Sequence, residues 1–319
     1  MNNKTVTLQA GLRIGLKKGL SGFLWIMKIV LPISFMTALL AWSGWLHHLD
    51  FILAPAMELL GLPPFAALPL IIGILANIYG AIAAMVILPF TTAQMTIMEI
   101  FLLTAHSLIM EGIIQARSGL HPLKATIFRL AAATATVMLV SPFLIDHQTV
   151  NLPVKAIVTT DITFLQMLKD WAWANLILGV KIFGICMVLL TMLEIFKSMG
   201  WITFIVNIFS PFLKIMGLEK KMGFLWVTAI VFGLSYGGAV IVEETKNGEL
   251  SKEDLEMLHL SIGINHSMVE DPPLFISLGL SAFWLYVPRL IIAIVAARLM
   301  RLWFWYKNKT QFTVNKNLD

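Results

Sequence analysis

The stretch PAMELLGL (residues 55–62) returns later in the chain as PFLKIMGL (residues 211–218), with its proline and its glycine at the same places. Further matches flank this pair on both sides in the same order, and their offset drifts only from 153 to 160. Apolar composition alone does not produce such an ordered series, so the sequence predicts an internal duplication. The other matched residues are Lys28 with Lys181, Trp45 with Trp201, Tyr79-Gly80 with Tyr236-Gly237, His106-Ser107 with His266-Ser267, and Arg129 with Arg289.

The composition places the duplicated unit in a membrane. Of 319 residues, 58% are hydrophobic and only 13% are charged, against about 25% charged in soluble domains. The apolar residues form stretches of roughly 20, which is enough for a helix to cross a hydrocarbon core. Alternating strands of the barrel type are absent from the sequence pattern. We therefore expect an all-α polytopic membrane protein with the lipid bilayer as its solvent.

The repeat divides the chain into five segments. We expect a cytoplasmic amphipathic segment, a first membrane repeat, an extracytoplasmic linker, a second membrane repeat and a cytoplasmic tail. Each repeat should contain about three spanning helices, one interfacial helix, and a re-entrant or broken hairpin at 62–90 or 218–242. The five segments are residues 1–21, 22–145, 146–174, 175–305 and 306–319, in that order.

Lysine and arginine predict the orientation of the two repeats. The segment after the first span of repeat one has no lysine or arginine, whereas its counterpart contains Lys197, Lys214, Lys220 and Lys221. Because cytoplasmic loops are enriched in these residues, the two copies should be inverted, with both termini in the cytoplasm. We expect a multi-pass protein of the cell inner (plasma) membrane. Basic residues at these helix ends account for the net charge of +5. We therefore do not expect nucleic acid as a partner.

Polar residues gather where each repeat interrupts an apolar helix. The segment GINHSMVEDPP (residues 263–273) ends in a proline pair, and a helix broken there exposes backbone groups that need water or a ligand. Sites of this kind recur at the repeat interface of transporters with inverted repeats. The candidate substrate- or ion-binding residues here are Asn265, His266, Ser267, Glu270 and Asp271, with His106, Ser107 and Glu111 in repeat one.

Histidine beside carboxylate suits a transition metal or a proton relay. His266 and Glu270 are four residues apart, which would place them on one helix face. We expect His106, His266 and Glu270 to be the metal ligands, if a metal binds. The alternative is that the acids pair with Arg129 and Arg289.

Further polar positions have two interpretations each. Lys28 and Lys181 match between the repeats and could hold an anion, although extension of the side chain toward the interface explains them more simply.

Two aromatic-glycine pairs mark the hairpins. Tyr79-Gly80 and Tyr236-Gly237 are candidate binding positions, because glycine permits positive φ and close backbone approach. Close packing of helices through small residues explains these glycines equally well.

Several motifs of enzymes are missing from the sequence. There is no phosphate-binding loop, no H-E-x-x-H zinc helix and no G-x-S-x-G nucleophile elbow. We do not expect an enzyme, and the sequence identifies no cofactor.

The segments GLSYGGAVIVEE (residues 233–244) and INHSMVEDPPLF (residues 264–275) resemble the nucleoside-recognition or Gate family of membrane proteins. That family includes the spore maturation proteins A and B and the Gate regions of Feo-type ferrous-iron transporters. The resemblance implies transport or permeation, with residues 265–271 as the best-matched region. Feo-type proteins also carry a GTPase and a Gate-region cysteine, which this chain does not show, so the resemblance does not extend to their form of iron transport.

Two functions from different classes follow. The first is a transporter or permease of a small solute or ion, either nucleoside-like or a divalent cation, with its site between the inverted repeats. The second is a membrane scaffold or regulatory subunit that docks a partner through the acidic stretch 243–256. The pattern leaves open whether the protein associates with further copies of itself or with another membrane partner.

Overall fold

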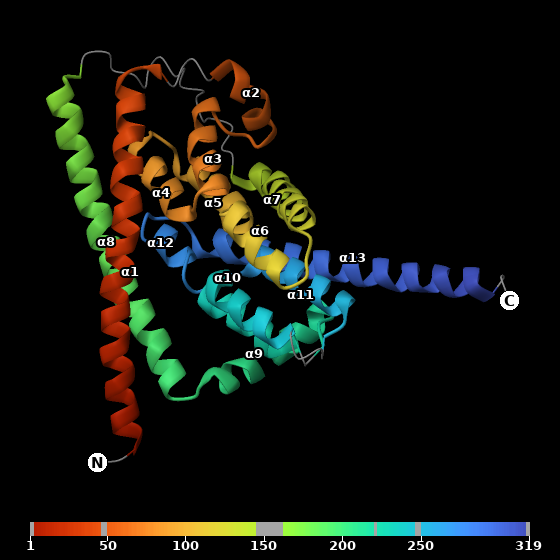
Figure 1. Cartoon of the computed structure of the whole chain (residues 1–319). Helices are drawn as coiled ribbons and strands as arrows, with labels where there is room; N and C mark the ends of the chain where they lie inside the picture. The colour runs from red at the N-terminus through yellow and green to blue at the C-terminus, as the bar shows by residue number, and fades with distance from the viewer. Residues whose placement is uncertain (1–2, 46–49, 145–161, 220–221, 246–249, 317–319) are drawn as a thin grey trace.

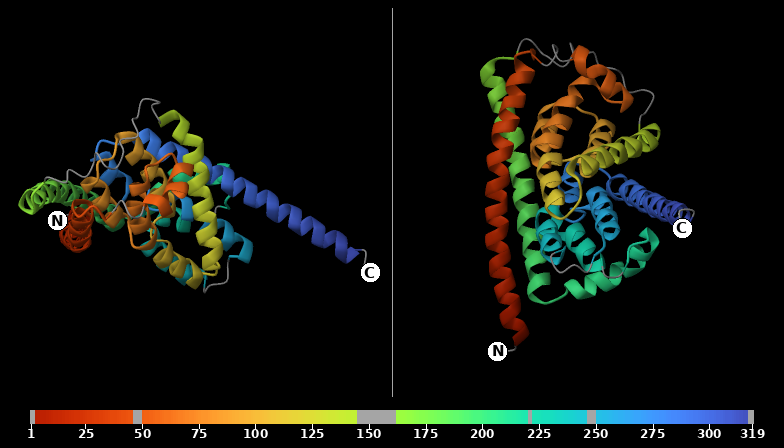
Figure 2. Two further views of the ribbon diagram at one scale, coloured as in Figure 1. Left: turned by 90° about the horizontal axis from the view of Figure 1, so that it is seen from above. Right: turned by 45° about the vertical axis from the view of Figure 1, so that its right-hand side comes forward.

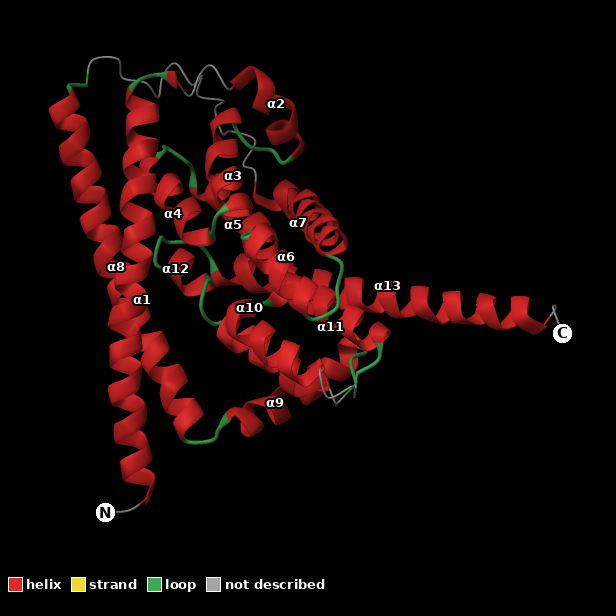
Figure 3. Cartoon of the chain, in the orientation of Figure 1, coloured by secondary structure: helices red, strands yellow, loops and turns green. Residues whose placement is uncertain are grey.

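The computed structural model describes residues 3–45, 50–144, 162–219, 222–245 and 250–316, and within these ranges every regular element is a helix (Figure 3). This confirms the predicted all-α class. The elements are α1 (Asn3–Trp42), α2 (Asp50–Leu59), the 3₁₀ turn η2 (Pro64–Ala66), α3 (Ala67–Leu75), α4 (Ile78–Ile87), α5 (Thr92–Ala105), α6 (Leu108–Arg117), α7 (Pro122–Leu144), α8 (Phe164–Ser198), α9 (Ile202–Met216), α10 (Gly223–Thr245), α11 (Lys252–Asn265), α12 (Pro272–Ile276) and α13 (Ala282–Lys316).

The long helices α1 and α8 lie side by side along one flank of the molecule (Figures 1 and 2). They run antiparallel. Near the start of α1, a Cβ on Gly11 would lie 2.4 Å from Ser198 Oγ, at the end of α8. Ser34, near the end of α1, donates to Asn175 Oδ1 at 2.8 Å, near the start of α8. Small residues allow this close approach of two backbones.

Five helical stretches within the described residues are long and apolar enough to cross a membrane: Leu8–Trp42, Thr92–Arg117 (α5 and α6 together), Pro122–Leu144, Phe164–Ser198 and Ala282–Lys307. Three of them belong to repeat one and two to repeat two. The third span expected in repeat two corresponds to α11 and α12. Helix α11 has 14 residues with an acidic first turn, and α12 has 5, so neither is long enough to cross a membrane by itself.

Each repeat also contains a helical hairpin. In repeat one, α3 and α4 turn back at Ala76 and Asn77, and a Cβ on Gly73 would contact Ala81 Cβ at 3.1 Å. In repeat two, α10 turns at Gly233 (φ 73°, ψ 170°), and a Cβ on Gly237 would lie 2.5 Å from Ala229 Cα. Residues eight apart in a straight helix are about 12 Å apart. Both predicted hairpin stretches therefore fold back on themselves.

Several helices extend past the boundaries expected from sequence. Helix α1 begins at Asn3, inside the predicted N-terminal segment, and α13 continues to Lys316, through much of the predicted tail. Helix α8 begins at Phe164, inside the predicted linker, where Thr163 Oγ1 accepts from Gln166 N at 3.3 Å and caps it. Residues 145–161 of that linker lie outside the described residues. The inverted orientation and the membrane sidedness stay predictions.

Two apolar clusters form the core. The first joins α1, α3, α4, α5 and α8 to α12 and the start of α13. The second joins α9, α10, α11 and the middle of α13. Buried polar side chains from α5, α6, α11 and the turn before α12 interrupt this apolar interior. A membrane helix bundle tolerates such groups where they serve one another or a ligand.

Candidate functional site

Two helices break at equivalent places in the repeats. Helix α5 ends at Ala105 and α6 begins at Leu108, while α11 ends at Asn265. At the two breaks, Ser107 (φ 50°) and Ser267 (φ 53°) are the non-glycine residues with positive φ in the part of the chain that the structure describes. Such a backbone is uncommon for serine. The matched sequence landmarks thus have matched local structure.

Each break is hydrogen-bonded to the hairpin of its own repeat. Ser107 N donates to Gly73 O at 2.8 Å, and Ser267 N donates to Ala229 O at 3.4 Å. Ser107 Oγ adds a bond to Ala76 O at 3.3 Å. A Cβ on Gly233 would lie 2.8 Å from Ser267 Oγ, so the hairpin turn of repeat two contacts the second break directly. Ser107 and Ser267 therefore connect the hairpins to the breaks.

Two fully buried arginines complete the broken helix ends. Arg129 donates to Thr104 O at 2.8 Å and to His106 O at 2.9 Å. Arg289 donates to Ile264 O at 2.9 Å and to His266 O at 2.9 Å. The last carbonyls of a helix have no partner within the helix, and a cation there also complements the helix dipole. Both arginines therefore have a structural role.

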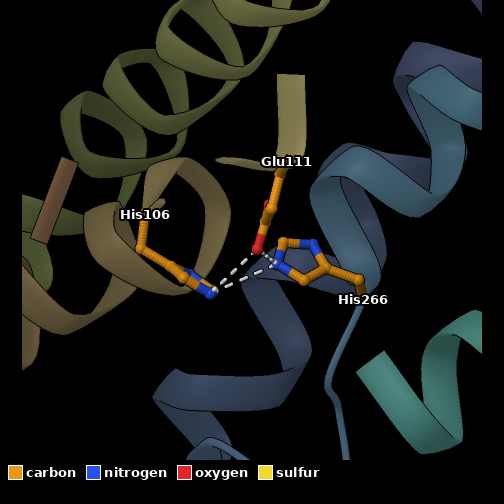
Figure 4. A group of neighbouring side chains, drawn as sticks. All are labelled: His106, Glu111 and His266. Carbon is orange, nitrogen blue, oxygen red and sulfur yellow. Dashed lines mark hydrogen bonds and ion pairs between the residues drawn. The ribbon is translucent and has the colours of Figure 1, made fainter. Parts of the chain in front are cut away.

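The side chains at the two breaks converge in one buried group (Figure 4). His106 Nε2 lies 3.4 Å from His266 Nε2. Glu111 Oε1 lies 3.1 Å from His266 Nε2 and 3.4 Å from His106 Nε2. The second oxygen of Glu111 forms an ion pair with Arg129. This group of His106, Glu111 and His266 joins residues from both halves of the chain.

The expected pairing of His266 with Glu270 is wrong. Helix α11 ends at Asn265, and His266 has an extended backbone (φ −63°, ψ 162°), so the four-residue spacing no longer places both side chains on one helix face. Glu270 instead lines a cavity of about 80 Å³ together with Tyr79 and Cys186. Glu111 takes the place predicted for Glu270 as the carboxylate beside the histidines.

Asp271, the counterpart of Glu111, lies beside the group. Its Oδ2 is 3.6 Å from His106 Nε2 and has no hydrogen-bond partner among the described residues. The amide of Asn265, Arg289 Nη1 and both carboxylate oxygens of Glu99 are likewise buried without such a partner. Buried polar atoms of this kind need a partner such as water or a ligand.

Glu99 was not identified from sequence, although one signal existed. At the repeat offset of 160 it aligns with His259, and both residues are buried with their side-chain polar atoms unbonded in the described structure. An acid in the middle of the apolar helix α5 is itself a reason to suspect a functional position.

The aromatic-glycine pairs serve the hairpins. The N–H of Gly80 donates to Asn77 Oδ1 at 2.9 Å, and a Cβ on Gly80 would lie 2.7 Å from side-chain atoms of Ile33 and Ile72. Gly237 packs against the other arm of its own hairpin. Both glycines therefore allow close packing, while the side chain of Tyr236 lies outside the described residues.

The matched lysines differ in their surroundings. Lys181 Nζ donates to Ser277 O at 2.8 Å, at the end of α12, which gives it a structural partner. Lys28 is exposed on α1.

Comparisons with known proteins agree with the resemblance seen in the sequence. Residues 23–140, which lie within repeat one, match the family model described as Gate: Nucleoside recognition. The chain is also 26% identical over 280 residues to the "Uncharacterized membrane protein YvoD" of Bacillus subtilis (strain 168), an alignment covering 86% of this chain and 88% of that protein. No solved structure matches. Residues 23–140 are thus similar to the Gate (nucleoside recognition) family, and the chain as a whole is similar to a membrane protein.

Proposed function

We propose that the protein is a transporter or permease that binds a small solute or ion between its two halves. One observation carries this proposal: His106 and His266, from opposite halves, meet with Glu111 at two helix breaks inside an apolar helix bundle. Ionisable groups are costly inside a membrane and mark substrate or ion pathways. Broken helices that meet at a repeat interface are the usual site in secondary transporters.

The contacts of the breaks indicate how access would change. Each break is bonded to the hairpin of its own repeat, through Ser107 N to Gly73 O and through Ser267 N to Ala229 O. A movement of either hairpin would therefore shift the histidine next to the serine. In this proposal, the α3–α4 hairpin and the α10 hairpin open and close the two sides of the site in turn.

The scaffold alternative has less support. Of the acids in its docking stretch 243–256, Glu256 pairs with Lys124 on α7, and Asp254 Oδ2 accepts from Ser251 N to cap α11. These two acids therefore already have partners within the chain.

A ligand screen tests the transporter. The purified protein would be heated with nucleosides, nucleobases or divalent cations, because a ligand that binds only the folded state raises its stability, by about 2.7 kcal/mol at 100 times Kd. The double variant His106→Ala/His266→Ala should lose the response. His121→Ala, on an exposed position at the start of α7, is the matched control and should keep it.

Uptake into proteoliposomes completes the test. A compound that stabilises the wild type should enter vesicles that contain the wild type or the His121→Ala variant, and enter more slowly with the double variant. If the folded wild type neither responds to any of these compounds nor moves them, the transporter proposal is contradicted.

A further inference from the structure

The two central histidines have a fixed protonation pattern. His106 Nδ1 lies 2.8 Å from Leu102 O, and His266 Nδ1 lies 3.1 Å from Ile262 O. A carbonyl oxygen can only accept a hydrogen bond, so Nδ1 carries the proton in both rings. In a neutral imidazole the other nitrogen, Nε2, then presents a lone pair. Both of these Nε2 atoms point into the site.

Three electron-rich atoms therefore meet in a buried space. The Nε2 atoms of His106 and His266 are 3.4 Å apart, and Glu111 Oε1 lies 3.4 Å and 3.1 Å from them. Lone pairs at these distances repel unless a positive charge lies among them. One added proton would form a single N–H bond and relieve one contact. A cation at the centre would be attracted to all three atoms.

The distances fit a metal ion. Zinc binds imidazole nitrogen at about 2.0–2.1 Å, and the corresponding tetrahedron places neighbouring ligand atoms about 3.3–3.4 Å apart. The three distances observed between the ligand atoms are 3.1, 3.4 and 3.4 Å. The site is thus preorganised for an ion of this size.

The surroundings of the three ligands also match those of metal sites. Metal-binding histidines commonly donate their other ring N–H to a backbone carbonyl, as His106 and His266 do here. Arg129 holds Glu111 Oε2 and leaves Oε1 directed at the histidines. Because Arg129 balances the charge of Glu111, the nearby carboxylate of Asp271 supplies further negative charge for a cation.

We propose that the solute or ion of this protein is a divalent first-row transition metal bound by His106 Nε2, His266 Nε2 and Glu111 Oε1. The inference rests on the proposed function, since it names what that site binds. Imidazole nitrogens select zinc, iron and their neighbours over magnesium and calcium. Three protein ligands leave a fourth position open, as in sites that exchange a ligand, which suits an ion that must enter and leave.

Cobalt(II) binding tests the site in the purified full-length protein. Four-coordinate cobalt has intense visible absorption, which octahedral aqueous cobalt lacks. The wild type should bind one ion with this spectrum, and Zn²⁺ should displace it. Loss of a residue that only hydrogen-bonds to a metal ligand weakens binding by roughly 10- to 100-fold. His106→Ala and His266→Ala remove a ligand itself, so each should weaken binding by at least this much. Glu270→Gln and His121→Ala are matched controls and should bind as the wild type does.

A second variant keeps the test independent of folding defects. His266→Cys retains a ligand atom, so it should still bind cobalt and should add the near-ultraviolet absorption of a sulfur-to-cobalt transition. The metal proposal is overturned if the folded wild type binds neither cobalt nor zinc. It is also overturned if binding survives in His106→Ala and His266→Ala alike.

The two proposals fail separately. If a nucleoside stabilises the wild type through the two histidines and no metal binds, the transporter stands and the metal inference is wrong. If cobalt binds through the histidines but no metal crosses proteoliposome membranes, the metal site stands and the transporter is wrong.

Discussion

Replacing Gly233 by alanine should destabilise the protein strongly, although the change adds only one methyl group. The backbone of Gly233 (φ 73°, ψ 170°) lies in a region that is essentially restricted to glycine, at a cost of about 1–3 kcal/mol for another residue. The new Cβ would also lie 2.8 Å from Ser267 Oγ and 3.3 Å from Glu270 Oε2. Overpacking of this kind costs about 1–3 kcal/mol. The two effects together predict a loss of about 2–6 kcal/mol.

Thermal unfolding in detergent, followed by tryptophan fluorescence, measures this loss. The matched control is Gly184→Ala in α8, where no atom lies within 4 Å of the added Cβ. Alanine is favoured over glycine in a helix by about 1 kcal/mol, so the control should be unchanged or more stable. Gly233→Ala should also weaken ligand binding, because Ser267 would have to move. If Gly233→Ala unfolds at the temperature of the wild type, the hairpin does not turn at Gly233 as described.

Three further predictions concern charge and topology. Glu111→Ala should cost about 3–5 kcal/mol in thermal unfolding, because it leaves Arg129 buried without its ion pair; a loss under about 1 kcal/mol would contradict the pairing. Lys124→Ala should cost less than about 1 kcal/mol in the same assay, since this side chain is 45% exposed, and a larger loss would mean that the ion pair is more than a surface contact. Cysteines introduced by Ser43→Cys and Met199→Cys, at the matched ends of α1 and α8, should label from opposite sides of the membrane; labelling from one side would contradict the inverted repeat.

Much of the architecture could be predicted because the repeat is visible in the chain itself. Apolar stretches indicated the long helices, and paired glycines and prolines indicated both hairpins. Polar residues in an apolar context made His106 and His266 candidates for one site, and the structure places their rings in contact. Their contact in the fold follows from the repeat, since equivalent residues on a duplicated unit can meet at the interface between its copies.

The choice of carboxylate could not be predicted, because it depends on the residue at which a helix ends. The expectation that His266 and Glu270 share a helix face assumed that α11 continues through His266. The left-handed backbone of Ser267 instead redirects the chain. Repeat one gave even less warning, because neither proline nor glycine occurs at its break, from Ala105 to Leu108. The capping of helix ends by Arg129 and Arg289 depends on contacts over 23 to 25 residues and has no local pattern.

Duplication usually creates a spare copy, but here it does not. Each half of the chain contributes one imidazole to the central group, and the carboxylate with the shortest contact comes from the first half alone. If the proposed site is correct, loss of either histidine would disable the same site, and no intact second site would remain to compensate. The proposal therefore has a genetic consequence. Two mutant chains, each altered in a different half and present in the same membrane, would not restore function. Function would return only if the two chains exchanged whole halves.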